Sequence, residues 1–316
     1  MREENMDTIK SYEYLSCIDK CGSISQAATE LYVSQPALSQ FIIRLEDELG
    51  AEILIRKATP LKFTEFGQVL LNKLRKIYLI QKSLKKDIED INYLEKGRIV
   101  IGTLNYYSVS ILAPLLPKFL KKYPGIEIKI VDGSLPELEE MAEHGKTDLS
   151  LLMLPLKSKE LNYEYLIGED VLIAINKDHP LAKKLYKNWQ DPSTFPEVDL
   201  NDLSKENFII LTKGKRLRDA FDEASSLIKT PVSIIAESND INNSLILASS
   251  GIGIALCTSV YAKKYKSGLE LAFLSPKQKL SINPIVCAYN SSYELSKSSR
   301  LLLNMLKDFC QDISDF

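Results

Sequence analysis

The feature that most constrains how this chain can fold is a narrow apolar stripe between residues 70 and 91. Its members recur at alternating intervals of four and three residues, and only the glutamine is polar: Leu70, Leu74, Ile77, Gln81, Leu84, Ile88 and Ile91. This heptad spacing is typical of a helix that packs lengthwise against a second helix. A long helix with so narrow a stripe cannot bury itself on a domain surface. We therefore expect residues 67–97 to form a helix that dimerises with its own copy.

The segment before this helix carries the start and stop signals of three shorter helices. Apolar residues at helical spacing predict a first helix over residues 7–22 that ends at Gly22. Ser23, followed three residues later by a glutamine, predicts the start of a second helix. Ser34 predicts the cap of a third helix, with a proline in its first turn and Gly50 at its end.

Three helices followed by a β-hairpin make a winged helix-turn-helix, which we expect over residues 1–66. The run AEILIRKATPLKFT contains two short β-like segments around a Thr-Pro step and predicts the wing. Ala27 and Ala28 let the second helix approach its neighbours closely. The start of the third helix suits a phosphate, and three of its polar side chains can hydrogen-bond base edges: Gln35, Ser39 and Gln40. An ordinary helical hairpin also fits this local pattern.

Beyond Gly97 the pattern changes to an alternation of strands and helices. RIVIGTL, GIEIKIVDG and TDLSLLML read as strands separated by helical segments, and the alternation continues to a final helix near the C-terminus. Repeated strand–helix–strand units indicate an α/β region with parallel or mixed sheets and right-handed crossovers.

Composition excludes some classes of protein and leaves others open. The 316 residues suit two or three domains, and 45% hydrophobic with 26% charged residues is typical of a globular protein. No apolar run reaches the length of a membrane span, and the N-terminus lacks the apolar core of a signal peptide, so we expect a cytoplasmic protein. With a net charge of −2, no overall basic field indicates nucleic acid, and a DNA-binding function must rest on local architecture.

The five cysteines are scattered, which favours reduced, mostly buried thiols over a disulfide framework. Cys17 and Cys21 lie four residues apart and can share a helix face. No histidine or further cysteine lies nearby to complete a tetrahedral metal site, so we expect no metal there.

Several motifs together resemble the LysR-type transcriptional regulators. The N-terminal segment that contains the predicted helix-turn-helix carries SQPALS, LEDELG, Arg56, Thr64 and Gly67. The α/β region carries KYPGIEI, DLSLL, DHPLA and SSGIGIAL in order. The resemblance covers nearly the whole chain. It implies a winged helix-turn-helix, a dimerising linker helix and a two-lobed, periplasmic-binding-protein-like effector domain. The lobes would comprise residues 98–168 with 276–316, and residues 169–275, with crossings near Gly168–Asp170 and Leu274–Lys277.

The same resemblance implies the functional residues and partners. On double-stranded operator DNA, it assigns Ser34, Gln35, Pro36, Ser39, Gln40, Arg44, Arg56 and Lys57. For a small-molecule effector, an organic acid or an amino acid, it assigns Thr103, Asn105, Tyr107, Ser108, Ser134 and Thr212. It implies a homodimer or homotetramer, and no cofactor, metal or catalytic residue. Many members carry Arg or Lys where this chain has Gln40, which favours adenine-type or water-mediated contacts here.

Sequence motifs also help to judge three alternative functions: an enzyme, a solute-binding transport protein and a redox-sensing regulator. GIGIAL lacks the spacing of a dinucleotide fingerprint, and neither G-x-S-x-G nor H-E-x-x-H occurs, so an enzyme is not expected. A solute-binding transport protein would need a signal peptide and would not carry the predicted helix-turn-helix. A redox-sensing regulator of the same family remains open. The cluster Lys213, Lys215, Arg216 and Arg218 favours a solvated helix start over an anion site.

Overall fold

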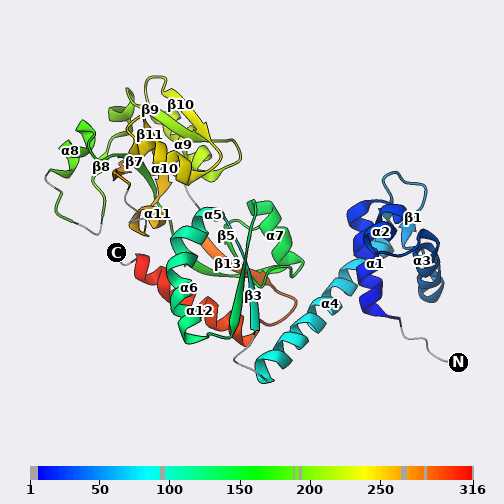
Figure 1. The fold of residues 1–316 in the computed structure, drawn as a ribbon. Coiled ribbons are helices and arrows are strands. Elements are labelled where there is room, and N and C mark those ends of the chain that lie inside the picture. Colours follow the sequence, from blue (N-terminus) through cyan, green and yellow to red (C-terminus); the bar gives the residue numbers. More distant parts are fainter. Residues whose placement is uncertain are drawn as a thin grey trace. The chain divides into compact units, whose positions relative to one another are not determined.

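The protein is described by a computed structural model that covers residues 6–92, 97–187, 189–191, 194–264, 269–280 and 283–314. The chain divides into two compact units (Figure 1). The first comprises Met1–Asn92 with Ser291–Ser296, and the second comprises Tyr93–Asn290 with Lys297–Phe316. Among the described residues, no helix is long and apolar enough to cross a membrane.

The first unit begins with the three predicted helices: α1 (Thr8–Cys21), α2 (Ile24–Glu30) and α3 (Gln35–Leu49). The predicted caps are confirmed, because the Ser23 and Ser34 side chains accept from backbone N–H groups three residues on. Gly22 and Gly50 end α1 and α3 with φ of 61° and 67°, a left-handed conformation that favours glycine. Ala27 and Ala28 are buried in the core of this unit, so α2 packs closely on its neighbours.

The wing follows α3 as a short antiparallel pair, β1 (Leu54–Ile55) and β2 (Lys62–Phe63). Glu46 of α3 fastens it, because its Oε1 accepts from the backbone N–H groups of Ile53 at 2.8 Å and Leu54 at 3.3 Å. The other oxygen of Glu46 pairs with the Arg56 guanidinium at 2.6 Å. The wing is thus held to α3 by one carboxylate.

Helix α4 (Glu65–Asn92) is continuous, as predicted, and starts two residues before the predicted boundary at residue 67. The prediction that Leu74 faces a partner helix is wrong, because its side chain is buried in the core of its own unit, where α4 packs on α1. Leu70 is half-buried against the same core, and Gln81 is half-buried. The exposed apolar residues of α4 lie mainly further along: Ile77, Ile80, Leu84 and Ile88. The side chain of Ile91 lies outside the described residues.

Lobe one of the second unit is a mixed sheet in the order β4-β3-β5-β13-β6. β3 runs parallel to β4 and β5, and β13 runs antiparallel to β5 and β6. Its strands are β3 (Gly97–Thr103), β4 (Ile126–Asp132), β5 (Leu149–Met153), β6 (Leu161–Ile167) and β13 (Ile285–Asn290). Its helical segments are α5 (Asn105–Tyr107), the π-helical turn η1 (Ser108–Leu112), α6 (Ala113–Lys122), α7 (Leu135–Glu143) and α12 (Lys297–Ser314).

Lobe two is a second mixed sheet in the order β10-β9-β11-β7-β12-β8. Its strands are β7 (Val171–Asn176), β8 (Glu197–Val198), β9 (Asn207–Leu211), β10 (Ser233–Ser238), β11 (Ile254–Thr258) and β12 (Leu271–Pro276). Its helices are α8 (Pro180–Tyr186), the 3-10 turn η2 (Leu200–Leu203), α9 (Arg216–Leu227), α10 (Ile241–Ser249) and α11 (Ser259–Lys264).

The chain passes between the lobes twice. The first crossing lies between β6 and β7, at the predicted Gly168–Asp170. The second lies later than the predicted Leu274–Lys277, because Lys277 donates its N–H to the Val198 carbonyl at 2.9 Å and Leu280 is buried in the core of lobe two. The predicted start of the returning segment at residue 276 is therefore too early.

Candidate DNA-binding and effector-binding sites

The start of α3 presents the side chains that the sequence assigns to DNA. Gln35, Pro36, Gln40 and Arg44 are exposed, Ser39 is half-buried, and the Ser34 hydroxyl caps the helix by accepting from the Ala37 N–H at 3.3 Å. Gln35 donates from Nε2 to the Ser39 hydroxyl at 2.9 Å. The groups of residues 34–40 form one polar surface at the N-terminal end of α3, where a helix favours phosphate, and Arg44 lies one turn beyond Gln40.

Tyr32 is a surface residue that the sequence did not assign. It lies in the turn between α2 and α3, its side chain is 97% exposed, and its φ of 54° is uncommon for a residue other than glycine. A backbone conformation of this kind has no signature in the residue type, so the sequence carried no signal for it. The exposed Tyr32 side chain thus belongs to a residue two positions before Ser34, the cap of α3.

The two assigned wing residues differ in their surroundings. Lys57 is exposed, whereas Arg56 is engaged by Glu46 and helps to hold the wing. Arg56 therefore has a structural role whether or not its half-exposed side chain also reaches DNA.

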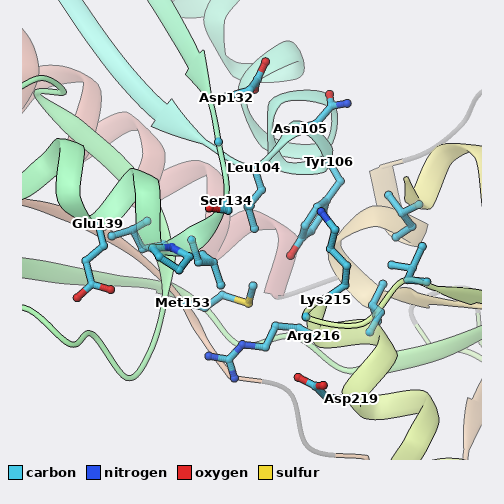
Figure 2. Close-up of a pocket in the computed structure, with 18 of the residues that line it drawn as sticks. Leu104, Asn105, Tyr106, Asp132, Ser134, Glu139, Met153, Lys215, Arg216 and Asp219 are labelled. Atoms are coloured by element: carbon cyan, nitrogen blue, oxygen red, sulfur yellow. The ribbon is translucent and has the colours of Figure 1, made fainter. Parts of the chain in front are cut away.

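A pocket of about 520 Å³ lies between the two lobes of the second unit (Figure 2). Its volume is within the range of small-molecule sites. Lobe one contributes Leu104, Asn105, Tyr106, Asp132, Gly133, Ser134, Leu135, Pro136, Glu139, Leu152, Met153, Pro155 and Lys157. Lobe two contributes Leu211, Gly214, Lys215, Arg216, Leu217, Asp219, Asn239, Asp240 and Ile241.

Only two of the six assigned effector residues, Asn105 and Ser134, line this pocket. Thr103 and Tyr107 are fully buried, so neither hydroxyl reaches the pocket surface. Ser108 and Thr212 also lie outside the lining. The short helix α5 explains one of these differences, because it turns Tyr107 inward and leaves its neighbour Tyr106 at the pocket.

The pocket carries both signs of charge. Its cations are Lys157, Lys215 and Arg216, and its acids are Asp132, Glu139, Asp219 and Asp240. Two of the acids are already engaged: Asp240 caps α10 by accepting from two backbone N–H groups, and Glu139 accepts the N–H groups of Lys157 and Ser158. These bonds fix the positions of two acids without removing charge, so cations and acids both remain in the pocket.

The predicted basic cluster divides between two roles. Arg216 lines the pocket and donates from Nη2 to the Leu154 carbonyl of lobe one at 3.3 Å. Arg218 instead pairs with Asp222 at 2.9 Å and Glu237 at 3.4 Å, within lobe two. Lys213 is exposed and lies outside the lining. Part of the cluster, with Lys215, thus belongs to the pocket rather than to a solvated helix start.

A buried carboxylate, Glu169, lies in the first crossing between the lobes. Its Oε2 accepts from the Tyr107 hydroxyl at 2.8 Å, and its Oε1 is buried with no hydrogen-bond partner among the described residues. Burial raises the pKa of Glu169 to about 7, although hydrogen bonds with Thr258 and Tyr107 oppose the rise. The sequence carried no signal for this site, because an acid between two strands normally faces water.

The five cysteines are free, and three of them are buried: Cys257, Cys287 and Cys310. Burial raises the pKa of Cys257 and Cys287 far above the ordinary thiol value and that of Cys310 to about 12. For Cys17, burial and then a hydrogen bond with Cys21 raise the pKa to about 11. These four thiols are therefore protonated at neutral pH, which disfavours oxidation by peroxide.

Comparison with known families agrees with this architecture. Residues 93–311 match the LysR substrate binding domain, and residues 9–68 match the bacterial regulatory helix-turn-helix protein of the lysR family. The chain belongs to the LysR family. A LysR regulator binds DNA through its helix-turn-helix, binds a small-molecule effector in the substrate-binding domain, and forms oligomers.

Individual members show the same relationship at low identity. The chain is 25% identical to the HTH-type transcriptional regulator YybE of Bacillus subtilis, over 77% of this chain and 80% of YybE. It is 29% identical to the DNA-binding transcriptional dual regulator OxyR of Escherichia coli, over 67% of this chain and 66% of OxyR. A full-length OxyR variant from Pseudomonas aeruginosa has the same fold, with a TM-score of 0.64 and 18% identity over 98% of this chain and 95% of that one.

Proposed function

We propose that the LysR regulator reads its operator with the exposed N-terminal end of α3. Gln35, Ser39 and Gln40 contact base edges in the major groove, while Tyr32 and Lys57 contact phosphates on either side. The exposed polar surface at the start of α3 carries this proposal. Residues 1–66 hold seven Lys and Arg against eleven Asp and Glu, so one such domain binds weakly and several joined domains are needed.

Substituting a residue that contacts a base should change sequence preference, whereas substituting one that contacts a phosphate should weaken binding to all sequences. For Gln40→Ala we expect operator binding to weaken by about 5- to 150-fold, with relaxed preference at one base pair. For Lys57→Ala we expect a loss that is similar on all sequences and a salt slope smaller by about one. Fluorescence anisotropy on DNA selected from a randomised pool measures both effects. If Gln40→Ala weakened binding equally on every DNA sequence, Gln40 would not contact a base.

In the pocket, we propose an effector that carries a carboxylate, such as an organic acid or an amino acid. Lys215 and Arg216 lie at the N-terminus of α9, whose cap residue supplies no side-chain hydrogen bond. The partial positive charge at the helix start and the two cations together favour an anionic group there. Asp219 and Asn105 are placed to accept or donate hydrogen bonds to a second polar group, whereas the Ser134 hydroxyl already donates to Glu137 at 2.7 Å. Tyr106, Met153 and Leu217 supply apolar contact.

The proposed mechanism is a shift between arrangements of the two lobes. An effector between them binds one arrangement better, and that difference changes how linked copies present their DNA-binding domains. Its effect is limited to the difference in binding free energy between the states, typically ~1–3 kcal/mol. We propose that copies dimerise through the exposed apolar residues of α4: Ile77, Ile80, Leu84 and Ile88.

A thermal-shift screen of small metabolites tests the pocket. A carboxylate ligand at a hundredfold excess over its Kd should stabilise the second unit by about 2.7 kcal/mol. For Arg216→Ala we expect that shift to be lost, whereas Lys213→Ala is the matched control because it removes a nearby exposed cation outside the lining. Equal loss in both variants would reduce the effect to general charge attraction. A shift kept by Arg216→Ala would place the ligand elsewhere.

A redox-sensing function is the second candidate, suggested by the likeness to OxyR. The buried, protonated thiols support it less than the pocket supports effector binding. The proposal gives the pocket a binding role without catalysis. It also places the regulator in the cytoplasm, where its DNA partner lies.

A further inference from the structure

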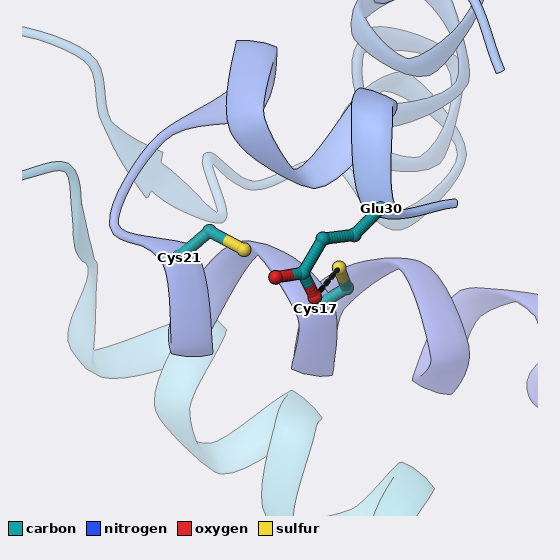
Figure 3. A group of neighbouring side chains, drawn as sticks. All are labelled: Cys17, Cys21 and Glu30. Carbon is teal, nitrogen blue, oxygen red and sulfur yellow. Dashed lines mark hydrogen bonds between the residues drawn. The ribbon is translucent and has the colours of Figure 1, made fainter. Parts of the chain in front are cut away.

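Three potential metal ligands from α1 and α2 meet in the DNA-binding unit. Cys17 and Cys21 lie four residues apart on α1, and Glu30 is the last residue of α2 (Figure 3). One ligand atom from each, the two sulfurs and a carboxylate oxygen, lies within 4.8 Å of the other two. No histidine or further cysteine lies near this pair in the sequence, which therefore predicted no metal here. Folding supplies a carboxylate.

The separations are close to those of a tetrahedral zinc site. With Zn–S near 2.3 Å and Zn–O near 2.1 Å, tetrahedral angles place ligand atoms roughly 3.5–3.8 Å apart. The Sγ of Cys17 lies 3.8 Å from Oε2 of Glu30, so this pair already has the required spacing. The third ligand needs a shift of about 1 Å at most, which side-chain rotation provides.

We propose that Cys17, Cys21 and Glu30 bind a divalent thiophilic ion of the zinc class. Two sulfur ligands exclude Mg²⁺ and Ca²⁺, which prefer oxygen. The cysteines are half-buried and Glu30 is exposed, so an ion can enter from solvent and water can take the fourth position. Each thiol gives up its proton to solvent as the ion binds, and no oxidation state changes.

The ion has one charged competitor in the described structure. Lys20 Nζ lies 3.1 Å from Oε2 of Glu30, an exposed ion pair that the metal must displace. Once bound, the ion links α1 to the end of α2, immediately before the turn that leads to α3. We therefore expect it to stabilise the helix-turn-helix and to make the stability of this unit depend on metal.

Titration of the full-length reduced protein with Co²⁺, a spectroscopic substitute for Zn²⁺, tests the site. We expect one Co²⁺ per chain with a thiolate-to-cobalt absorption band, and displacement of that band by Zn²⁺. Cys17→Ser and Cys21→Ser should each weaken binding at least about 100-fold, since even outer partners of a metal site cost 10- to 100-fold. Lys20→Ala should tighten binding several-fold by releasing Glu30, whereas Asp19→Asn, an exposed acid on the same helix, should leave it unchanged.

Glu30→Gln separates a three-ligand site from a simple pair of thiols. It keeps the shape of the side chain and should weaken Co²⁺ binding at least about tenfold. Binding that is unchanged by Glu30→Gln, or a band that persists in Cys17→Ser, would overturn the proposal. Calorimetry adds a readout that does not use the band: Zn²⁺ should raise the unfolding midpoint of the wild-type DNA-binding unit but not that of Cys21→Ser. Equal midpoints with and without Zn²⁺ in the wild type would also overturn it.

Discussion

Replacing Gly67 by alanine is expected to lower the free energy of unfolding of the DNA-binding unit by roughly 2–4 kcal/mol. Gly67 lies in the first turn of α4, and a β-carbon built on it overlaps the backbone carbonyl oxygen of Ile53. Ile53 is fully buried and its N–H is held by Glu46, so its backbone cannot move aside freely. The start of α4 must move instead, which strains the bond from the Gly67 N–H to the Thr64 hydroxyl at 2.9 Å.

The direction of the stability change distinguishes steric overlap from helix propensity. Alanine is the better helix former, and without the overlap the substitution would stabilise an α-helix by about 0.5–1 kcal/mol. Gln68→Ala, at the next and exposed position, is the control and should change stability by less than about 0.5 kcal/mol. Calorimetric unfolding and operator binding measure the result. A more stable Gly67→Ala protein would show that α4 and Ile53 separate without cost.

Glu169→Gln is expected to stabilise the second unit at pH 8 and to have little effect at pH 5. In the unfolded chain this carboxyl has a pKa near its ordinary value of 4.5, whereas burial raises the pKa to about 7 in the folded protein. A raised pKa means that the folded state holds its proton more tightly. The wild type therefore loses stability as the pH rises from about 4.5 to 7, by roughly 3 kcal/mol in total.

The amide cannot ionise, so the variant should lack this loss. Tyr106, Tyr107 and Cys257 lie in the same region, and burial raises the pKa of each, so none of them ionises between pH 5 and 8. Asp170→Asn is the matched control, because it removes the exposed neighbouring acid and leaves the buried Glu169 carboxyl in place, so most of the pH dependence should remain. Denaturant unfolding of the second unit at pH 5, 6, 7 and 8 measures the difference. Parallel curves for the wild type and Glu169→Gln would refute the buried, partly neutral carboxyl.

The helix caps show what short-range chemistry determines. Ser23 and Ser34 start helices, and Gly22 and Gly50 end them, because a cap depends on the residue type and on backbone groups three or four positions away. The order of strands and helices was predictable for the same reason, since each has its own period of apolar residues. The motifs of SQPALS and LEDELG then indicated the family.

The apolar stripe of α4 shows what the spacing of apolar residues cannot predict. The spacing identified the helix, but Leu74 and Ile77 have the same type and period, and one is buried against α1 while the other is 44% exposed. The spacing of apolar residues predicts that one face of the helix is buried, but it does not identify the partner that buries it. Only the packing of α1 on the first half of α4 distinguished the two.

At the functional sites, sequence alone determined the family, the reader helix and the presence of a ligand domain. Tertiary structure decided which side chains meet. The turn of α5 placed Tyr106 rather than Tyr107 at the pocket, and α9 brought Arg216 within reach of the Leu154 carbonyl of the other lobe. Glu30 joined Cys17 and Cys21 only because α2 folds back on α1. Such sites depend on contacts between segments far apart in the chain, whereas caps and periods depend on neighbours.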